Sequence, residues 1–216
     1  MMRAMDINLN QINLLYVAYF LGAYLLGSIP FGLLLTKWFG MGDIRDIGSG
    51  NIGTTNVLRA GSKKVAALTF LFDALKGTVP AYLATLFEPA IAPFIAFTVV
   101  LGHVFPVWLK FKGGKGVATS FGATLGLSWP LALMMLVTWI AIAATTRLSS
   151  LAALVTAALS PFFAFVLTTF HFVLYAFALC LLLVFTHKNN IKRLILSQES
   201  KIGDTSEPQS NPSAED

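Results

Sequence analysis

The sequence predicts an all-α polytopic membrane protein with about seven transmembrane helices, some of them short. Of the 216 residues, 56% are hydrophobic and only 12% are charged, whereas about 25% of the residues in a soluble domain are charged. Several apolar runs follow one another along the chain, and some have the roughly 20 residues that a helix needs to cross a bilayer. The basic residues lie in every second connection, as in proteins whose cytoplasmic loops share one side of a membrane.

The apolar runs define the expected helices in chain order. They cover residues 12–35, 65–87, 90–109, 117–127, 130–145, 151–169 and 172–186. The first, third, sixth and seventh are long enough to span, although Gly102, His103 and Pro106 interrupt the end of the third.

The second and fourth runs are weaker candidates for a full span. The fourth is about half a span long, and the second contains Asp73 and Lys76. We expect both to form short, tilted or partly interfacial helices packed against the others, because a charge that faces lipid at mid-depth is costly. Spaced three residues apart, Asp73 and Lys76 either form a structural ion pair or flank a site.

The distribution of lysine and arginine sets the expected orientation. The connections after the first, third and fifth runs and the C-terminal segment are basic, and include Arg45, Arg59, Lys63, Lys64, Lys110, Lys112, Lys115, Arg147, Lys188, Lys192, Arg193 and Lys201. The opposite connections contain no lysine or arginine, and only Arg3 lies on their side. Because cytoplasmic loops are enriched in basic residues, we expect the N-terminus outside and the polar loops and C-terminus in the cytoplasm.

Composition divides the chain into two parts. We expect residues 1–196 to form one integral membrane domain. The remaining residues, 197–216, become rich in serine, glutamate, aspartate and proline, which predicts a disordered polar tail in the cytoplasm. The single cysteine, Cys180, lies inside an apolar run and cannot form an intrachain disulfide.

The polar stretch at residues 45–56 is the first candidate site. Its donors and its positive charge come from Gly48, Ser49, Gly50, Asn51, Gly53, Thr55, Asn56 and Arg45. The glycines allow tight turns that present backbone N–H groups, so the stretch predicts an anion cradle, with a plain surface turn as the alternative. The spacing from Gly48 to Gly53 is similar to that of a P-loop, but Thr54 stands where the phosphate-binding lysine is needed, which excludes a P-loop ATPase.

The second candidate site is the glycine-rich basic segment at residues 110–119. It contains Lys110, Lys112, Gly113, Gly114, Lys115 and Gly116. Because it opens directly into an expected helix, its cations and backbone N–H groups could face one anion. The alternative, a basic membrane anchor, accounts for the lysines but not for the glycines. His103, just before this segment, is either a hydrogen-bonded core histidine or a substrate contact.

Two shorter polar segments lie on the same expected face. Ser149 and Ser150 precede the sixth run, where they either cap a helix or contact a substrate. After the seventh run, helical spacing places His187 and Asn190 on one face, with Arg193 one turn further on. The convergence of four polar segments on one face is the main functional signal in the sequence.

Several chemistries are missing from the sequence pattern. The three histidines are spread along the chain and no His/Cys cluster occurs, so we expect no metal. No Gly-x-Ser-x-Gly motif occurs, and no histidine has an acidic residue four or five positions later. No internal repeat is found either, which argues against a transporter built from duplicated halves.

Together these segments resemble the PlsY family of bacterial acyl-phosphate:glycerol-3-phosphate acyltransferases. The motifs that carry the resemblance are Asp43-x-Arg45-x2-Gly48-Ser49-Gly50-Asn51-x-Gly53-x-Thr55-Asn56, Gly102-His103-x-Phe105-Pro106, Phe111-Lys112-Gly113-Gly114-Lys115-Gly116-Val117-Ala118-Thr119 and His187-x2-Asn190-Ile191-x-Arg193-Leu194. They occur in the family's order between residues 27 and 201. Two positions depart from the family pattern, with Thr54 in place of alanine and Ser197 in place of glycine.

The resemblance implies transfer of a fatty acyl group from acyl phosphate to the C1 hydroxyl of glycerol 3-phosphate. The products are lysophosphatidic acid and inorganic phosphate, in the first step of bacterial phospholipid synthesis. It also implies a protein of the bacterial cytoplasmic (inner) membrane whose active site lies at the cytoplasmic face. No cofactor is expected. The residue chemistry agrees, because two glycine-rich basic loops match two phosphates and an acyl phosphate is already activated, so orientation and charge stabilisation suffice without an acyl-enzyme.

The expected site residues fall into three groups. The catalytic group is Arg45, Ser49, Lys115, His187 and Asn190; the phosphate-binding group is Gly48, Gly50, Asn51, Gly53, Thr55, Asn56, Lys112, Gly113, Gly114 and Gly116; further substrate contacts are His103, Ser150 and Arg193. Which loop binds which phosphate stays open. So does the proton acceptor, although the resemblance implies an oxygen of a substrate phosphate.

The alternative function is an anion or organophosphate transporter. Its polar groups should run through the membrane, yet charge within the apolar runs is limited to Asp73 and Lys76 and the outer connections carry no basic residue. As an enzyme, the chain has acyl phosphate, glycerol 3-phosphate and the lipid bilayer as its expected partners, and no nucleic acid. An upstream enzyme that forms acyl phosphate is implied but leaves no trace in this sequence.

Overall fold

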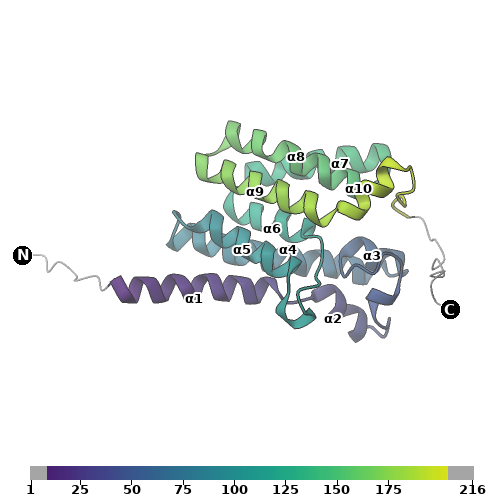
Figure 1. Ribbon diagram of the computed structural model, residues 1–216, viewed down its shortest axis with the longest axis horizontal. Coiled ribbons are helices and arrows are strands. Elements are labelled where there is room, and N and C mark those ends of the chain that lie inside the picture. The colour runs from purple at the N-terminus through teal and green to yellow at the C-terminus, as the bar shows by residue number, and fades with distance from the viewer. Residues whose placement is uncertain (1–8, 204–216) are drawn as a thin grey trace, which may run out of the picture.

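The computed structural model describes residues 9–203, and every regular element in that part of the chain is a helix (Figure 1). The α-helices are α1 (Leu9–Gly27), α2 (Phe31–Trp38), α3 (Thr54–Arg59), α4 (Lys63–Phe87), α5 (Ala92–Val104), α6 (Val117–Leu127), α7 (Trp129–Thr146), α8 (Ser149–Leu167), α9 (Phe170–Thr186) and α10 (Lys188–Ile195). Two short 3₁₀ helices, η1 (Ile44–Asp46) and η2 (Val107–Leu109), lie in the connections.

The long helices lie side by side in a bundle, and the short helices α2, α3 and α10 gather at one end of it (Figure 1). α4 packs against α5 and α6, α1 packs against α5, and α8 packs against both α7 and α9. The up-and-down path of the chain brings the four polar segments of the sequence to the end where the short helices lie.

Glycines bring the central helices α4 and α6 close together. A Cβ atom on Gly122 would overlap the carbonyl oxygen of Ala74, and one on Gly77 would overlap that of Thr119. Only glycine fits at these crossing points, as at other close helix contacts in membranes. The contact keeps α4 inside the bundle, so that the two charged residues at its middle are buried.

Three helical segments are long and apolar enough to cross a membrane alone, by length and composition. They are residues 92–109, which comprise α5 and η2, and the helices α7 and α8. Two bent pairs, α1 with α2 and α9 with α10, meet the same test if each counts as one span, which gives up to five in the described residues. α6, with 11 residues, is apolar but shorter, as expected from the fourth run. The fold is therefore all-helical, with apolar helices of membrane-spanning length.

The first apolar run differs from the single expected span. The structure divides residues 12–35 between α1 and α2, with a bend of 40° between them. Pro30 stands immediately before α2. Because proline has no N–H and disfavours a helical conformation in the residue before it, a continuous helix breaks here.

The C-terminal segment also differs from the expected domain boundary at residue 197. Residues 197–203, which we call the C-terminal strap, fold back onto the polar end of the bundle and hydrogen-bond to it. The rest of the expected tail, residues 204–216, and the N-terminal segment around Arg3 lie outside the described residues.

Candidate active site

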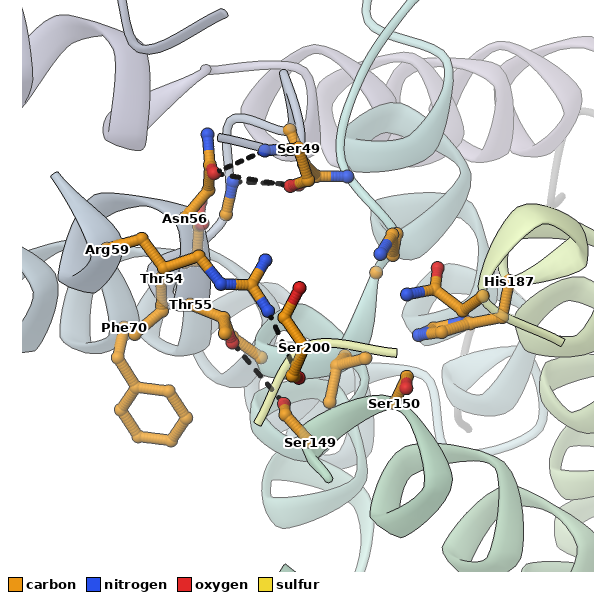
Figure 2. A pocket seen from close by; sticks show the side chains of 18 of the residues that line it. Ser49, Thr54, Thr55, Asn56, Arg59, Phe70, Ser149, Ser150, His187 and Ser200 are labelled. Atoms are coloured by element: carbon orange, nitrogen blue, oxygen red, sulfur yellow. Dashed lines mark hydrogen bonds between the residues drawn. The ribbon is translucent and has the colours of Figure 1, made fainter. Parts of the chain in front are cut away.

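A cavity opens at the polar end of the bundle, and all four polar segments of the sequence contribute to its wall (Figure 2). Its lining consists of Ser49, Asn51, Gly53, Thr54, Thr55, Asn56, Arg59, Phe70, Asp73, His103, Lys115, Gly116, Val117, Ala118, Trp139, Ser149, Ser150, His187, Asn190, Glu199 and Ser200. Most of these residues are polar, while α4, α6 and α7 contribute the apolar side chains of Phe70, Val117, Ala118 and Trp139.

The structure brings most, but not all, of the predicted site residues to this cavity. Those that line it are Ser49, Asn51, Gly53, Thr55, Asn56, His103, Lys115, Gly116, Ser150, His187 and Asn190. Those outside the lining are Arg45, Gly48, Gly50, Lys112, Gly113, Gly114 and Arg193. Lining residues that the sequence analysis left out of the site include Thr54, Arg59, Asp73, Trp139, Ser149, Glu199 and Ser200.

Asn56 organises the first loop. Its side-chain oxygen accepts hydrogen bonds from the N–H (2.9 Å) and the hydroxyl (3.2 Å) of Ser49, and its amide group donates to the carbonyls of Ile44 (3.0 Å) and Ile47 (2.9 Å). Gly48 has a φ of +56° and lies so close to the Asn56 oxygen that a Cβ atom would clash. The loop is therefore closed on Asn56, which presents Ser49 to the cavity (Figure 2).

The arginine that lines the cavity beside the first loop is Arg59, which follows the stretch at residues 45–56, and not Arg45. Arg45 lies on the surface, where its guanidinium pairs with Asp43 at 2.6 Å. Arg59, on α3, extends along the cavity and donates to the carbonyl of Ser200 at 3.4 Å (Figure 2). The spacing of Asn56 and Arg59, which places both on one helix face, is the sequence signal that could have identified it.

Lys115 is the lysine of the second loop that lines the cavity, whereas Lys110 and Lys112 are exposed and lie outside the lining. Its backbone carbonyl accepts a hydrogen bond from the Thr186 hydroxyl at 3.0 Å, which ties the loop to the end of α9. Burial lowers the pKa of Lys115 to about 8, although the Glu199 carboxylate opposes this shift. Lys115 therefore carries its charge at neutral pH and loses it at mildly alkaline pH.

The C-terminal strap closes one side of the cavity through Glu199. The Glu199 carboxylate accepts hydrogen bonds from Ser150 (2.8 Å), Asn190 (2.6 Å) and Arg193 (2.7 Å). Burial alone would raise the pKa of Glu199, but these hydrogen bonds outweigh it and hold the pKa below its usual value. An ionised Glu199 thus joins α8, α10 and the strap. Arg193 is not a lining residue, but it binds the Glu199 carboxylate.

His187 faces the cavity with one ring nitrogen already engaged. Its Nδ1 lies 2.8 Å from the carbonyl of Leu183 and 3.3 Å from the Thr186 hydroxyl. Because a carbonyl can only accept, Nδ1 carries the proton and Nε2 is left as an acceptor. No carboxylate contacts Nδ1 in the described structure, and no cysteine lines the cavity. Within residues 9–203 no group of three His, Cys, Asp or Glu side chains could hold a metal ion.

Several buried polar atoms at the cavity lack a protein partner. Among the described residues these are Thr54 Oγ1, Arg59 Nε, Trp139 Nε1, Asp73 Oδ1 and His103 Nδ1, of which the last two lie in an ion pair with each other. Buried donors are nearly always hydrogen-bonded in folded proteins. The donors of Thr54, Arg59 and Trp139, together with the charge of Lys115, suit an anionic ligand with several oxygen acceptors.

Comparison with known proteins assigns most of the chain to one protein family. The family model described as glycerol-3-phosphate acyltransferase matches residues 17–197. The glycerol-3-phosphate acyltransferase of Brucella anthropi is 51% identical over 181 residues, which cover 83% of this chain and 90% of that protein. The corresponding protein of Rhodopseudomonas palustris is 52% identical over 191 residues, covering 88% and 97%.

Solved structures agree with this relationship. The crystal structure of PlsY, an integral membrane glycerol 3-phosphate acyltransferase, in its glycerol 3-phosphate form matches with a TM-score of 0.83 and 38% identity, covering 87% of this chain and 95% of that one. The lysophosphatidic acid form of PlsY matches with a TM-score of 0.81 and 37% identity. This chain belongs to the glycerol-3-phosphate acyltransferase family.

Proposed function

We propose that this chain transfers a fatty acyl group from acyl phosphate to the C1 hydroxyl of glycerol 3-phosphate, giving lysophosphatidic acid and inorganic phosphate. The observation that carries the proposal is the joint presence of Arg59 and Lys115 in one cavity whose lining also includes apolar and aromatic side chains. Two cations at a helix-bundle end suit two phosphates, while these apolar side chains suit a fatty chain. Family membership supports glycerol 3-phosphate as acceptor, and the sequence resemblance supports acyl phosphate as donor.

The phosphates would be held by charge and by the first loop. Arg59 offers a planar fork of donors that matches phosphate oxygens, and Lys115 offers a compact ammonium. Ser49 and Thr55 add hydroxyl donors from the same wall of the cavity. In this proposal the remaining predicted residues of the two loops shape the backbone or contribute to the positive surface around the entrance, rather than touching substrate.

The reaction would proceed by direct attack. The oxygen of the C1 hydroxyl bonds to the acyl carbon, the bond between that carbon and the phosphate oxygen breaks, and a phosphate oxygen takes the hydroxyl proton. No residue needs to become acylated, because the mixed anhydride is already reactive. Lys115 and Arg59 would stabilise the negative charge that builds up on the departing phosphate.

Glycerol 3-phosphate would be oriented by His187 and its neighbours. The Nε2 atom of His187 can accept a hydrogen bond from a substrate hydroxyl, since Nδ1 is occupied by a backbone carbonyl. Asn190 is fixed next to it by Glu199, and Ser150 is held by the same carboxylate. An ordered set of this kind aligns a hydroxyl group with the carbonyl that it attacks.

For the membrane topology we propose seven spans, with the N-terminus outside and the cavity at the cytoplasmic face of the inner membrane. The distribution of lysine and arginine supports this orientation. Cysteines introduced at Gly50 and Lys112, which are both exposed, should both react with a membrane-impermeant thiol reagent only in inside-out vesicles, in a Cys180→Ala background. Labelling of the two positions from opposite sides would overturn the arrangement.

The decisive experiment for the activity uses purified protein in proteoliposomes. Acyl phosphate, acyl-CoA and the acyl thioester of acyl carrier protein are each supplied with radiolabelled glycerol 3-phosphate, and lysophosphatidic acid, free phosphate and trapped label are measured. We expect lysophosphatidic acid and phosphate in equal amounts from acyl phosphate alone. Accumulation of label inside the vesicles without acyl transfer would favour the transporter instead.

A further inference from the structure

Two buried titratable residues, Asp73 and His103, line the cavity but have no role in the reaction proposed above. They come from different helices, α4 and α5, and are 30 positions apart in the sequence. The structure places His103 Nδ1 3.6 Å from Asp73 Oδ1. The His–Asp pair that the sequence lacks as a local motif therefore forms in space between two helices.

The Asp73 carboxylate is held firmly in place. Lys76 Nζ lies 2.7 Å from Asp73 Oδ1, and both side chains are almost completely buried. The same ammonium group donates to the carbonyl of Ile29 at 2.7 Å, in the break between α1 and α2. A buried carboxylate with a buried cationic partner has little freedom to turn, because any rotation would separate the charges. Asp73 thus presents a fixed oxygen to His103.

His103 in turn supports the second glycine-rich loop. Gly113 and Gly114 donate backbone hydrogen bonds to the carbonyls of Val104 and His103, both at 3.1 Å. The imidazole Nε2 lies against Gly114, and a Cβ atom at that position would overlap the ring. The next residue along the chain is Lys115. The loop therefore packs on the His103 side chain at Gly114, and the following residue, Lys115, is the one that lines the cavity.

This geometry argues against His103 as the base that takes the substrate proton. Nδ1 faces Asp73, and Nε2 is covered by Gly114. Nδ1 is buried and its nearest ionisable neighbour is the Asp73 carboxylate, while Nε2 packs against the loop backbone, so both ring nitrogens face protein groups.

We propose that the Asp73–His103 pair is a positioning device for Lys115: Asp73 fixes the imidazole ring, and the ring fixes the glycine loop that directs Lys115 into the cavity. The inference rests on the phosphate-binding role proposed for Lys115. A displacement of about 1 Å at a substrate-positioning group costs on the order of 100-fold in rate, so a device outside the reacting atoms has a measurable effect.

The test compares variants that break the pair with one that preserves it. His103→Gln removes the ring, and Asp73→Leu with Lys76→Met replaces the ion pair by apolar side chains without leaving one charge unpaired. Asp73→Asn with Lys76→Met also removes both charges but keeps an oxygen acceptor for Nδ1–H. The matched structural control is Tyr175→Phe, which removes a buried 3.2 Å hydrogen bond to Thr124 on α6, away from the cavity lining.

The measurements are kcat, the KM of each substrate, inhibition by inorganic phosphate, and Tm. We expect His103→Gln and the double variant Asp73→Leu with Lys76→Met to raise the KM of the substrate that Lys115 holds by about 10-fold. The phosphate concentration needed for inhibition should rise by the same factor, with a smaller effect on kcat. The asparagine variant should recover most of the phosphate binding. Tyr175→Phe should lower Tm and leave the kinetic constants unchanged.

Three outcomes are decisive against parts of the argument. If the pair-breaking variants lower Tm as Tyr175→Phe does but leave the KM values and phosphate inhibition unchanged, the pair is only structural. If kcat falls while phosphate inhibition stays at the wild-type value, Asp73 or His103 touches the reacting atoms and the positioning role is overturned. If Lys115→Ala itself has wild-type constants, the failure lies with the proposed function of Lys115 and not with the pair.

Discussion

The hydroxyl of Ser150 donates a 2.8 Å hydrogen bond to the carboxylate of Glu199, 49 residues further along the chain. The same carboxylate accepts from Asn190 and Arg193 on α10. One anion thereby fixes the N-terminal end of α8, the last helix and the C-terminal strap around the cavity. Two of its donors, Ser150 and Asn190, are themselves lining residues, so Glu199 controls the cavity wall through them.

Glu199→Gln should destabilise the fold and impair the enzyme together. The amide lacks the negative charge and presents one acceptor oxygen instead of two, so it cannot satisfy all three donors. Hydrogen bonds to charged groups contribute about 1.5–3 kcal/mol each, and we expect a loss of about 2 kcal/mol in the free energy of unfolding. Thermal unfolding in detergent and an acyl-transfer assay measure the two effects. Gln198→Ala, at an exposed neighbour, is the control, and an unchanged Tm in Glu199→Gln would contradict the prediction.

Arg59→Ala should reduce activity more than Arg45→Ala. Arg59 lines the cavity and has an unpaired Nε, whereas Arg45 forms an exposed ion pair with Asp43. Loss of a charge-assisted bond to phosphate should lower kcat/KM by about 10- to 100-fold, while loss of an exposed ion pair costs at most about 1 kcal/mol of stability. Steady-state kinetics with varied glycerol 3-phosphate and donor would check the order. The reverse order would support the sequence-based choice of Arg45.

The contrast between these arginines shows where sequence reasoning succeeded and where it stopped. Hydrophobic run length and charge placement were sufficient for an all-helical membrane fold with polar segments at one end, because those features are properties of the chain itself. Glycine and serine content identified the first loop, but its direction depends on how Asn56 closes it, and that closure turns Arg45 outward and Arg59 inward. The outward position of Arg45 is set by tertiary contacts and has no sequence pattern, whereas the three-residue spacing from Asn56 to Arg59 was a helical signal that pointed to Arg59.

Two further features were missed for different reasons. The break in the first apolar run depends on Pro30, a local signal that hydrophobic run length alone does not take into account. The Asp73–His103 pair joins two helices whose register is set by glycine contacts elsewhere in the bundle, so a search for a histidine and an acid close in sequence misses it.

Alkaline pH should weaken substrate binding through Lys115. Because burial lowers its pKa to about 8, the side chain is protonated below that pH and loses its charge as the pH rises through it. We therefore expect kcat/KM for the substrate that Lys115 holds to fall above about pH 8, since this parameter reports the free enzyme. The kcat profile should fall at higher pH, because a bound phosphate stabilises the ammonium.

Lys115→Arg is the matched variant for this pH dependence. A guanidinium group stays charged throughout the accessible range, so the alkaline fall in kcat/KM should disappear even if the maximal activity is lower. A fall at the same pH in Lys115→Arg would assign the titration to another group. Substrate stability at each pH is checked by following the donor without enzyme.

Trp139→Phe should impair the reaction without destabilising the fold. The indole Nε1 is buried at the cavity and has no protein partner, so its removal relieves a desolvation penalty of about 1–3 kcal/mol. The phenyl ring of the variant keeps an aromatic group in the cavity lining. We expect an unchanged or higher Tm together with a raised KM for the acyl donor, whose oxygens would use this donor group. Wild-type kinetics in Trp139→Phe would show that the indole N–H does not contact the substrate.

Ser197→Gly should stabilise the turn that begins the C-terminal strap. The N–H of Gln198 donates to the carbonyl of Arg193 at 2.7 Å, and the N–H of Ser197 donates to the carbonyl of Leu194 at 3.1 Å. This double pattern is a Schellman motif, in which the residue after the C-cap adopts a left-handed conformation and is usually glycine. Ser197 occupies that position with a φ of +55°.

A left-handed conformation costs a non-glycine residue about 1–2 kcal/mol, and the greater backbone entropy of glycine in the unfolded chain offsets roughly half of this. The net gain from Ser197→Gly should therefore be about 0.5–1 kcal/mol, visible as a higher Tm. Gln198→Gly is the matched control, because Gln198 is not among the residues with positive φ and should lose stability with the same substitution. Equal losses in both variants would mean that Ser197 bears no conformational strain. With the strain confirmed, the serine would mark a place where this chain holds the strap, and with it Glu199, less tightly than a glycine at the same turn would.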